Sequence, residues 1–342
     1  MAFLPALRRA AAVFLLAPGV AQAPAQPAAF ASNAPVASAA AGKFVRQHGR
    51  LHVAGTQLLD EHGAKIALRG VSLGWHSLWP RFYNEVAVQW LRQDFQCTVV
   101  RAAMGIEVGE RNYKQDPAFS KAKVEAVVAG AIKADMYVII DWHSHNINLQ
   151  EAKGFFAEMS KKYAKYPNII YEVFNEPDQE SWPEVKAYSE EIIKVIRAND
   201  PQNIILVGCP HWDQDINLPA ADPIKGYQNL MYTMHFYAAT HGKWLRDRTD
   251  AALQSGLPVF VSESAGMEAS GDGPLNPVAW QEYLHWLEAR GLSWVVWSVS
   301  DKDETCSMLQ KSASSTGPWS DADLKESGRQ TRAYLCKYNA GQ

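Results

Sequence analysis

The sequence of 342 residues is poor in several features that would point to particular classes of protein. It has no basic cluster and a formal net charge of -3, which argues against nucleic-acid binding. Beyond its first residues it has no apolar run long enough to cross a bilayer, so we expect no membrane contact in the mature form. No glycine-rich phosphate loop follows any apolar run, which argues against a nucleotide-binding open sheet.

The first 42 residues differ in composition from the rest of the chain. Arg8 and Arg9 precede a short apolar stretch, residues 10–20, and the small residues at 21–23 form a cleavage site, a pattern typical of a secretory signal peptide. Residues 24–42 are mostly Ala, Pro and Ser without charge, as in a linker or disordered arm. A mitochondrial presequence would carry more arginine along an amphipathic helix. We therefore expect a signal peptide (1–23), an arm (24–42), a catalytic domain (43–342) and secretion to the extracellular space or periplasm.

Export permits disulfide bonds, but the chain has only four cysteines. Cys97 lies in a strand-like run, and we expect it to be a free, buried thiol. Cys306 and Cys336 fall in a loop and a helix near the C-terminus, and of the three pairings they form the best candidate bridge.

From residue 44 onward, short apolar runs alternate with longer amphipathic ones. The expected strands are Ile66–Leu73, Cys97–Ala103, Tyr137–Asp141, Ile169–Phe174, Ile204–Val207, Met231–Phe236, Val259–Ser262 and Trp294–Val299. Several are almost continuously apolar, which is typical of parallel strands buried on both faces. Eight strand–helix units in about 300 residues predict an α/β fold, a (β/α)8 TIM barrel, and Leu51–Leu59 predicts a short N-terminal β-hairpin that closes its floor. A doubly wound open sheet is the alternative.

Amphipathic segments between these strands predict the helices of the barrel. Apolar residues at 185, 188, 192, 195 and 196 follow helical spacing, Ser181 and Glu184 fit a capping box, and Pro201 marks the end. The other expected helices are Ala87–Gln93, Lys121–Ala134, Gln150–Lys165, Trp244–Gln254 and Pro277–Ala289.

Polar and aromatic residues follow the strands at the end where a barrel carries its active site. In chain order these residues are Arg101, Asp141, Trp142, His143, Asn175, Glu176, Trp212, His235, Tyr237, Glu263 and Trp297. Glu176 and Glu263 both come directly after apolar runs, so their carboxyl groups should be partly desolvated. Two carboxyl groups held across a substrate are the machinery of glycoside hydrolysis.

The motifs at these positions resemble glycoside hydrolase family 5, in particular its bacterial and nematode endo-β-1,4-glucanases. The resemblance runs from about residue 57 to residue 328. It rests on LRGVSL (68–73), VVRAAM (99–104), VIIDWH (138–143), VFNEP (173–177), HFYAATHG (235–242), FVSE (260–263) and WSVSDKDE (297–304). It implies a secreted, endo-acting, retaining enzyme that cleaves β-1,4-glucosidic bonds in cellulose or mixed-linkage β-glucan.

The resemblance also implies roles for the catalytic centre. Glu176 matches the acid/base and Glu263 the nucleophile of a double displacement. Asn175 matches the residue that binds the 2-hydroxyl of the sugar being cleaved. Arg101 and Tyr237 match groups that hydrogen-bond the nucleophile and hold it ionised.

Further residues match the surrounding substrate-binding groups. His143 and His235 match residues of the same subsite, and Trp297 matches its aromatic wall. Lys302 and Glu304 match groups of the minus-side subsites, and Trp212 matches a plus-side platform.

The sequence departs from the family pattern at two places. Ser264, Ala265 and Gly266 follow the proposed nucleophile where the family usually has an aromatic residue, and Gly105 stands where a tyrosine is often found. These departures bear on the packing behind Glu263 and on the shape of one wall of the substrate site.

Other interpretations remain open from the residues alone. Asp141, His143 and His145 could form a metal cluster of a barrel hydrolase, although no further ligands are evident. A non-catalytic sugar-binding barrel would lack one of the two glutamates. A retaining β-mannanase or xyloglucanase is the alternative on the same scaffold. We expect no metal, no cofactor and a monomer.

Some carboxylates and tryptophans near strand ends have no clear role. We expect Glu107, Glu172 and Glu268 to be solvated in loops. Trp75 and Trp79 are as well suited to stacking on sugars as to packing, whereas we expect Trp142 and Trp319 to pack in the core.

Overall fold

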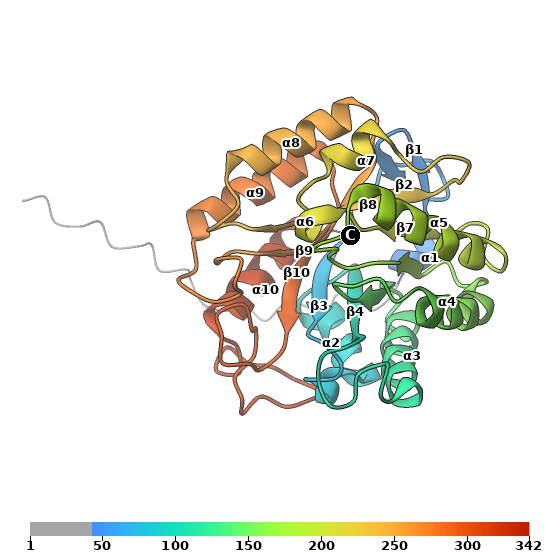
Figure 1. Cartoon of the computed structure of the whole chain (residues 1–342). Coiled ribbons are helices and arrows are strands. Elements are labelled where there is room, and N and C mark those ends of the chain that lie inside the picture. Colours follow the sequence, from blue (N-terminus) through green and yellow to red (C-terminus); the bar gives the residue numbers. More distant parts are fainter. Residues whose placement is uncertain (1–42, 342) are drawn as a thin grey trace, which may run out of the picture. The chain divides into compact units, whose positions relative to one another are not determined.

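Eight parallel strands close into a barrel in residues 43–341, the part of the chain that this computed structural model describes (Figure 1). The strands are β3 (Arg69–Leu73), β4 (Val99–Gly105), β5 (Tyr137–His143), β6 (Ile169–Glu172), β7 (Ile204–Val207), β8 (Leu230–Tyr237), β9 (Val259–Ala265) and β10 (Trp294–Val299). They pair in chain order, and β10 closes the barrel against β3. The predicted (β/α)8 barrel is thereby confirmed, while the predicted signal peptide and arm lie outside the described residues.

The strands are apolar on both faces because each has one face inside the barrel and the other under a helix. Val99, Ile139 and Ile170 belong to a cluster inside the barrel, whereas the adjacent Val100 and Val138 pack outward toward the helices. Alternate residues of a strand point to opposite faces, so this alternation decides which polar side chains point into the barrel.

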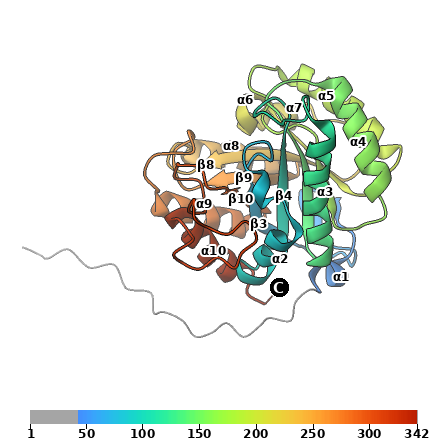
Figure 2. The ribbon, with the colours of Figure 1, turned by 90° about the horizontal axis from the view of Figure 1, so that it is seen from below.

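Helices between the strands form the outer layer, which Figure 2 shows from a second direction. They are α2 (Glu85–Asp94), α3 (Pro117–Lys133), α4 (Leu149–Tyr163), α5 (Trp182–Arg197), α6 (Pro210–Asp213), α7 (Asn217–Ala221), α8 (Lys243–Gln254), α9 (Pro277–Arg290) and α10 (Glu326–Tyr338). The predicted capping box is present, with Glu184 accepting a hydrogen bond of 2.8 Å from the backbone N–H of Ser181. None of the helices described is both long and apolar enough to cross a membrane.

The amino end of the barrel is closed by the first elements of the described chain. Helix α1 (Phe44–His48) precedes a hairpin of β1 (His52–Ala54) and β2 (Gln57–Leu59), which pair antiparallel. Phe44, Leu51 and Leu58 join the apolar cluster inside the barrel. This confirms the prediction of a hairpin at the barrel floor.

The structure differs from the sequence-based expectations mainly at the ends of elements. Strand β9 continues to Ala265, so that Glu263 lies within the strand, and β6 stops at Glu172, so that Asn175 and Glu176 lie in the following loop. Helices α1, α6 and α7 had not been expected, whereas α10 contains Cys336, which had been expected in a helix near the C-terminus.

One prediction about the cysteines is confirmed and one is wrong. Cys97 is a free, fully buried thiol, as predicted. Cys306 and Cys336 do not form a bridge, because the Cys306 thiol donates to Glu304 at 2.9 Å and the Cys336 thiol donates to the backbone of Asp94 at 3.4 Å. The location of the two residues near the C-terminus carried no information about their separation.

Candidate active site

Two adjoining hollows lie at the carboxyl ends of the strands and share Glu176, Tyr237 and Ala269. The larger has a volume of about 530 Å³ and is lined by His143, His145, Glu263, Trp297, Lys302 and Glu304 among others. The second has a volume of about 470 Å³ and is lined by Trp212, His235 and Trp244 among others. Together they form a cleft that continues on both sides of Glu176.

The two predicted carboxyl groups face each other across this cleft. A carboxylate oxygen of Glu176, a carboxylate oxygen of Glu263 and a ring nitrogen of His235 all lie within 4.8 Å of one another. Carboxyl groups of retaining glycosidases are about 5–5.5 Å apart, and those of inverting enzymes about 6.5–9.5 Å. The observed approach fits the narrower class.

Arg101 on β4 connects the charged groups beneath the cleft. Its guanidinium is fully buried and donates to both oxygens of Glu172, at 2.8 and 2.9 Å, and to Glu263 at 2.9 Å. It also donates to the side-chain oxygen of Asn175 at 2.5 Å and lies 3.0 Å from Asp141. Buried charges are costly unless they are paired and hydrogen-bonded, so this network gives Glu263 a fixed cationic partner.

Glu263 receives a second donor from the neighbouring strand. The Tyr237 hydroxyl on β8 donates to Oε1 at 2.7 Å, while Arg101 occupies Oε2. Both donors hold the carboxylate by hydrogen bonds to its charged form. The side chain is only 5% exposed, and that exposed part faces the cleft.

Glu176 has a different environment. Its Oε1 lies 2.8 Å from Nδ1 of His235, and its Oε2 lies 3.8 Å from Nδ1 of His145. Burial raises the pKa of Glu176 above its ordinary value, although His145 and Arg101 oppose this shift. A carboxyl group with a raised pKa keeps its proton to higher pH, as a general acid must.

Asn175 is fully buried beside Glu176, and its two polar atoms have different surroundings. The side-chain oxygen accepts from Arg101, which leaves the amide nitrogen to act as a donor. Within the described residues this nitrogen makes no hydrogen bond of good geometry, although the side chain is close enough to Glu176 to favour its ionised form. A buried donor without a protein partner is expected to bind a ligand or a water molecule.

Aromatic side chains form one wall of the larger hollow. The rings of His143 and Trp297 stack 5.1 Å apart at an angle of 6°, and Trp75 meets His143 edge-on at 4.5 Å. A Cβ atom at Gly105 would lie 2.9 Å from the Trp75 ring. The departure at Gly105 thus makes room for Trp75, and this tryptophan supplies an aromatic surface to the cleft.

Two contacts explain why the residues that follow Glu263 depart from the family pattern. The Ser264 hydroxyl donates to the backbone oxygen of Val295 at 2.8 Å. A Cβ atom at Gly266 would lie 2.3 Å from the buried Trp280 ring of α9. Trp280 therefore fills the space next to the strand, and a larger residue at position 266 would displace it.

The outer predicted residues lie at opposite ends of the cleft. Lys302 and Glu304 form an ion pair on the side of the larger hollow. Trp212 is 38% exposed and lines the smaller hollow together with Trp244, which is 45% exposed. Trp244 had been considered only as the start of a helix.

Not every expectation about the remaining carboxylates and tryptophans is correct. Glu172 is fully buried and paired with Arg101, so the expectation that it is solvated is wrong. Trp142 and Trp319 are buried in the core, as predicted, and Trp79 lines the larger hollow beside Trp75.

Asp141, His143 and His145, the residues of the alternative metal cluster, do not bring three ligand atoms together within the described part of the chain. Nδ1 of His143 contacts Asp141 at 2.7 Å, whereas Nδ1 of His145 contacts the backbone oxygen of Glu176 at 3.0 Å. Burial raises the pKa of Asp141 to about 8, against the opposing charge of Arg101. His143 is therefore part of the cleft wall, and His145 contacts Glu176.

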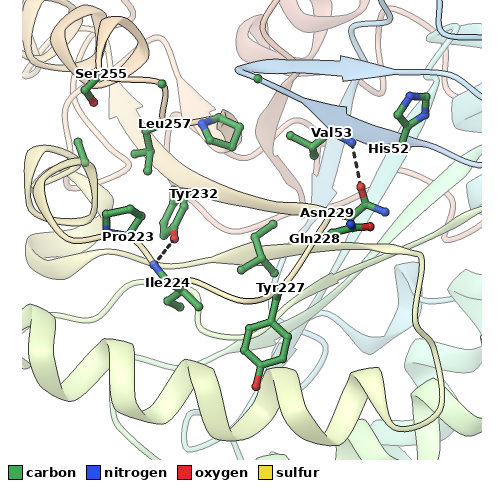
Figure 3. A pocket seen from close by; sticks show the side chains of 15 residues that line it. His52, Val53, Pro223, Ile224, Tyr227, Gln228, Asn229, Tyr232, Ser255 and Leu257 are labelled. Atoms are coloured by element: carbon green, nitrogen blue, oxygen red, sulfur yellow. Dashed lines mark hydrogen bonds between the residues drawn. The ribbon is translucent and has the colours of Figure 1, made fainter.

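A third hollow of about 530 Å³ lies at the amino ends of the strands (Figure 3). It is bounded by the hairpin at His52 and Val53 and by the segments around Tyr227 and Leu257. Among its lining residues, all within the described chain, there is no Asp, Glu, Lys or Arg. It therefore lacks the carboxyl groups present at the other end of the barrel.

Known proteins share both the sequence and the fold. The family model described as Cellulase (glycosyl hydrolase family 5) matches residues 59–303. An endoglucanase of Clostridium saccharobutylicum is 40% identical over 287 residues, which are 82% of this chain and 63% of that protein. The chain thus spans less than two thirds of that relative's length.

Solved structures agree with this similarity. A structure from Cytophaga hutchinsonii has a TM-score of 0.85 and 44% identity, and the match covers 86% of this chain and 97% of that one. The catalytic domain of Thermobifida fusca endoglucanase Cel5A, solved as a variant in complex with cellotetraose, has a TM-score of 0.80 and 32% identity. That match covers 85% of this chain and 99% of the domain.

Proposed function

The chain belongs to glycosyl hydrolase family 5, and on that premise we propose that it is an endo-acting, retaining β-1,4-glucanase. The observation that carries this proposal is the close approach, within 4.8 Å, of one carboxyl oxygen of Glu176 and one of Glu263 in an open cleft. The endoglucanase relative and the cellotetraose complex of a similar domain support a β-glucan as the substrate.

In the first step, Glu263 acts as the nucleophile. One of its carboxylate oxygens forms a bond to C1 of the sugar as the bond from C1 to the glycosidic oxygen breaks. Glu176 transfers its proton to that oxygen, so that the leaving chain departs as an alcohol. Arg101 and Tyr237, which donate to Glu263, hold the orientation of its carboxylate for the attack.

In the second step, Glu176 acts as a base. It takes a proton from a water molecule whose oxygen attacks C1, and the ester bond to Glu263 breaks to regenerate the carboxylate. The amide nitrogen of Asn175, which makes no hydrogen bond of good geometry among the described residues, donates to the 2-hydroxyl of the sugar. Retention predicts that the product first formed from a β-linked glucan is the β-anomer, which NMR during turnover measures.

The two sides of the cleft bind different parts of the glucan chain. Trp297, stacked on His143, forms the aromatic wall of the subsite where the bond is cleaved. Lys302 and Glu304 bind hydroxyl groups on the non-reducing side, and Trp212 supports the leaving chain. Aromatic faces suit this task because the faces of sugar rings are only weakly polar.

The preferred polysaccharide is tested by the release of reducing sugar from a panel of substrates. We expect carboxymethylcellulose and barley β-glucan to be hydrolysed faster than xyloglucan or mannan. Glu263→Gln serves as the inactive control for contaminating activity. A preference for mannan or xyloglucan would overturn the assignment of substrate while leaving the family unchanged.

We propose that the enzyme is secreted and acts as a monomer without a cofactor. Export is supported by the charge and apolar pattern of residues 1–23. Mass spectrometry of the exported protein should find an N-terminus near residue 24. Light scattering of that sample measures its oligomeric state, and activity in EDTA tests for a metal requirement.

A further inference from the structure

One buried acid beneath the cleft has no part in the mechanism described above. Asp213 ends α6 and is fully buried. His211, Trp212 and Asp213 have φ values of 62°, 54° and 58°, a left-handed turn that is costly for residues other than glycine. The turn places Trp212 in the cleft and Asp213 beneath it. Three such residues in succession require compensating interactions from the surrounding structure.

The two oxygens of Asp213 have different neighbours. Oδ1 accepts a hydrogen bond of 2.5 Å from the backbone N–H of Cys209. Oδ2 lies 3.2 Å from Nε2 of His235 and, within the described residues, has no assigned hydrogen bond. The carboxyl group is thus anchored on one side and directed toward the imidazole on the other.

Ser262 provides a second polar neighbour of the same ring nitrogen. Its hydroxyl donates to the carboxylate of Glu172 at 2.9 Å. A serine hydroxyl has a single proton, so its oxygen faces Nε2 of His235, 2.9 Å away, as an acceptor. Ser262 therefore favours a proton on Nε2. Burial and the nearby carboxyl groups of Glu176 and Glu172 raise the pKa of Asp213, whereas the N–H of Cys209 and the side chain of Thr233 oppose that shift. Asp213 favours the same position of the ring proton in its ionised form, in which Oδ2 is an acceptor.

The other ring nitrogen of His235 faces the proposed acid. Burial lowers the pKa of His235 to about 4, so the ring is neutral near pH 7 and carries one proton. With that proton on Nε2, Nδ1 is an acceptor. The contact of 2.8 Å between Nδ1 and Oε1 of Glu176 is then a hydrogen bond only if Glu176 supplies the proton.

We propose that Ser262 and Asp213 are positioning residues that hold the proton of His235 on Nε2, so that Nδ1 accepts a hydrogen bond from Glu176 and keeps it in its acid form. This inference rests on the proposed function, in which Glu176 must donate a proton. It assigns a role to the buried Asp213 and to the left-handed turn that carries it.

Charged and titratable groups of several elements face Glu176 or His235. They are Arg101 on β4, Asp141 and His143 on β5, His145 after β5, Glu172 on β6, Asp213 on α6, Tyr237 on β8, His241 after β8 and Glu263 on β9. Burial favours the acid form of Glu176, whereas His145, Arg101 and the side chain of Asn175 favour its ionised form. The hydrogen bond to His235 adds to the effect of burial.

The variant Asp213→Asn tests the proposal because it replaces the ionised carboxylate that the proposal places beside Nε2 with an amide of nearly the same shape. The N–H of Cys209 requires an acceptor, so the amide oxygen takes the position of Oδ1. The amide nitrogen then faces Nε2 of His235 as a donor, and the ring proton moves to Nδ1. There it donates to ionised Glu176 and favours loss of the acid proton.

Two kinetic results are expected of Asp213→Asn. The alkaline limb of kcat/KM moves to lower pH, because a lower pKa of Glu176 means that its proton is lost earlier. Hydrolysis of an aryl β-cellobioside with a poor leaving group slows roughly 10- to 100-fold at neutral pH, within the usual contribution of general acid catalysis. A dinitrophenyl cellobioside, which leaves without protonation, loses less than about threefold.

A matched control lies two residues away in the same segment. Asp215 is ion-paired with Arg248 outside the buried network, and Asp215→Asn should leave the alkaline limb unchanged. Ser262→Ala removes the other acceptor and should shift the limb in the same direction as Asp213→Asn, by a smaller amount. If Asp213→Asn does not fold, the kinetic comparison is made with Ser262→Ala instead.

A direct readout is the ¹⁵N NMR spectrum of the His235 ring in the whole protein, which distinguishes protonated from unprotonated ring nitrogens. We expect the proton on Nε2 in the wild type and on Nδ1 in Asp213→Asn. A proton on Nδ1 in the wild type would overturn the proposal, as would equal losses on both aryl substrates. A wild type that does not cleave β-glucans would contradict the proposed function instead, whatever tautomer the spectrum shows.

Discussion

The hollows at the two ends of the barrel have about the same volume, near 530 Å³, but they differ in chemistry. The hollow at the carboxyl ends is lined by Glu176 and Glu263, and it has the Arg101 network beneath it. The hollow at the amino ends is lined by side chains that include no Asp, Glu, Lys or Arg, with local bonds such as Ile224 N–H to the Tyr232 hydroxyl at 2.8 Å (Figure 3). Size alone therefore does not distinguish a site from a packing gap.

The position of buried charge is what separates the two ends. Arg101, Asp141, Glu172 and Asp213 are all fully buried under the carboxyl end. Burying a charge costs several kcal/mol unless it is paired, so such a cluster reduces stability unless its geometry is exact. We infer that these buried charges lower the stability of the barrel but are needed to orient Glu176 and Glu263. The following substitutions test that inference.

The largest effect is expected from Glu263→Gln. An amide cannot form the glycosyl ester, so turnover of barley β-glucan should fall roughly 10³- to 10⁶-fold, as for other lost nucleophiles. The amide has nearly the same shape, so circular dichroism should remain unchanged. Retention of more than a tenth of the activity in a pure sample would contradict the role of Glu263.

Replacing the acid/base should have a different signature. Glu176→Ala removes the proton donor, so substrates with poor leaving groups should lose about 10²- to 10⁴-fold in rate. Substrates with good leaving groups should regain turnover when azide attacks the glycosyl enzyme. Azide should give no such recovery with retention in Glu263→Gln, and a recovery there would reverse the two assignments.

The next largest effect concerns the network beneath the cleft. Arg101→Lys keeps the charge but loses the planar group that reaches Glu172, Glu263 and Asn175 together. We expect the free energy of unfolding to fall by about 3 kcal/mol, since each lost hydrogen bond to a charged group costs about 1.5–3 kcal/mol. Urea unfolding measures this change, and kcat should fall with it.

The matched control is Arg290→Lys on the outside of the barrel. Arg290 is paired with Asp250 at 2.7 Å and is partly exposed. Partly exposed pairs contribute about 0–1 kcal/mol, so the loss should be small. If the two substitutions cost the same, the buried network is no more than a set of ordinary ion pairs.

The fold and the two central carboxylates could be predicted because they depend on local pattern. Continuous apolar runs indicated buried parallel strands, and Glu176 and Glu263 directly follow such runs. Glu172 was assigned wrongly although a signal existed. It lies two residues after Ile170, which points into the barrel, so Glu172 must point inward as well and requires a partner such as Arg101.

Other features depend on contacts that the sequence does not display. The left-handed turn that buries Asp213 involves no glycine or proline at its three positions, so nothing local signals it. Trp75 occupies the space left by Gly105, and the two residues follow or end different strands, so their contact is not visible in the local sequence. The cysteine pairing failed for the same reason, because bridging requires a geometry that spacing alone does not determine.

A smaller effect is expected at the far side of the cleft. Trp212→Ala retains a Cβ atom, so the backbone cost of its φ of 54° is unchanged and only the ring is lost. We expect kcat/KM for cellopentaose to fall roughly 3- to 10-fold, which corresponds to about 0.5–1.5 kcal/mol of aromatic contact. Aryl cellobiosides, which place no sugar on this ring, should be unaffected. Equal losses on both would assign Trp212 to packing.

The smallest effect on activity is expected at the amino end of the barrel. Asn229 has a φ of 57°, accepts from the backbone of Val53 at 3.0 Å and donates to the backbone of Gln202 at 2.6 Å. Asn229→Ala removes both hydrogen bonds and puts alanine in a left-handed conformation, so the free energy of unfolding should fall by about 2 kcal/mol. Asn229→Gly removes the conformational cost of the positive φ and should recover about 1 kcal/mol of that loss.

Both variants should retain wild-type kcat/KM on β-glucan below their melting temperatures, because this end of a barrel contributes to stability rather than chemistry. A loss of activity without a loss of stability would show that this hollow takes part in function, and the contrast between the two ends would then be wrong.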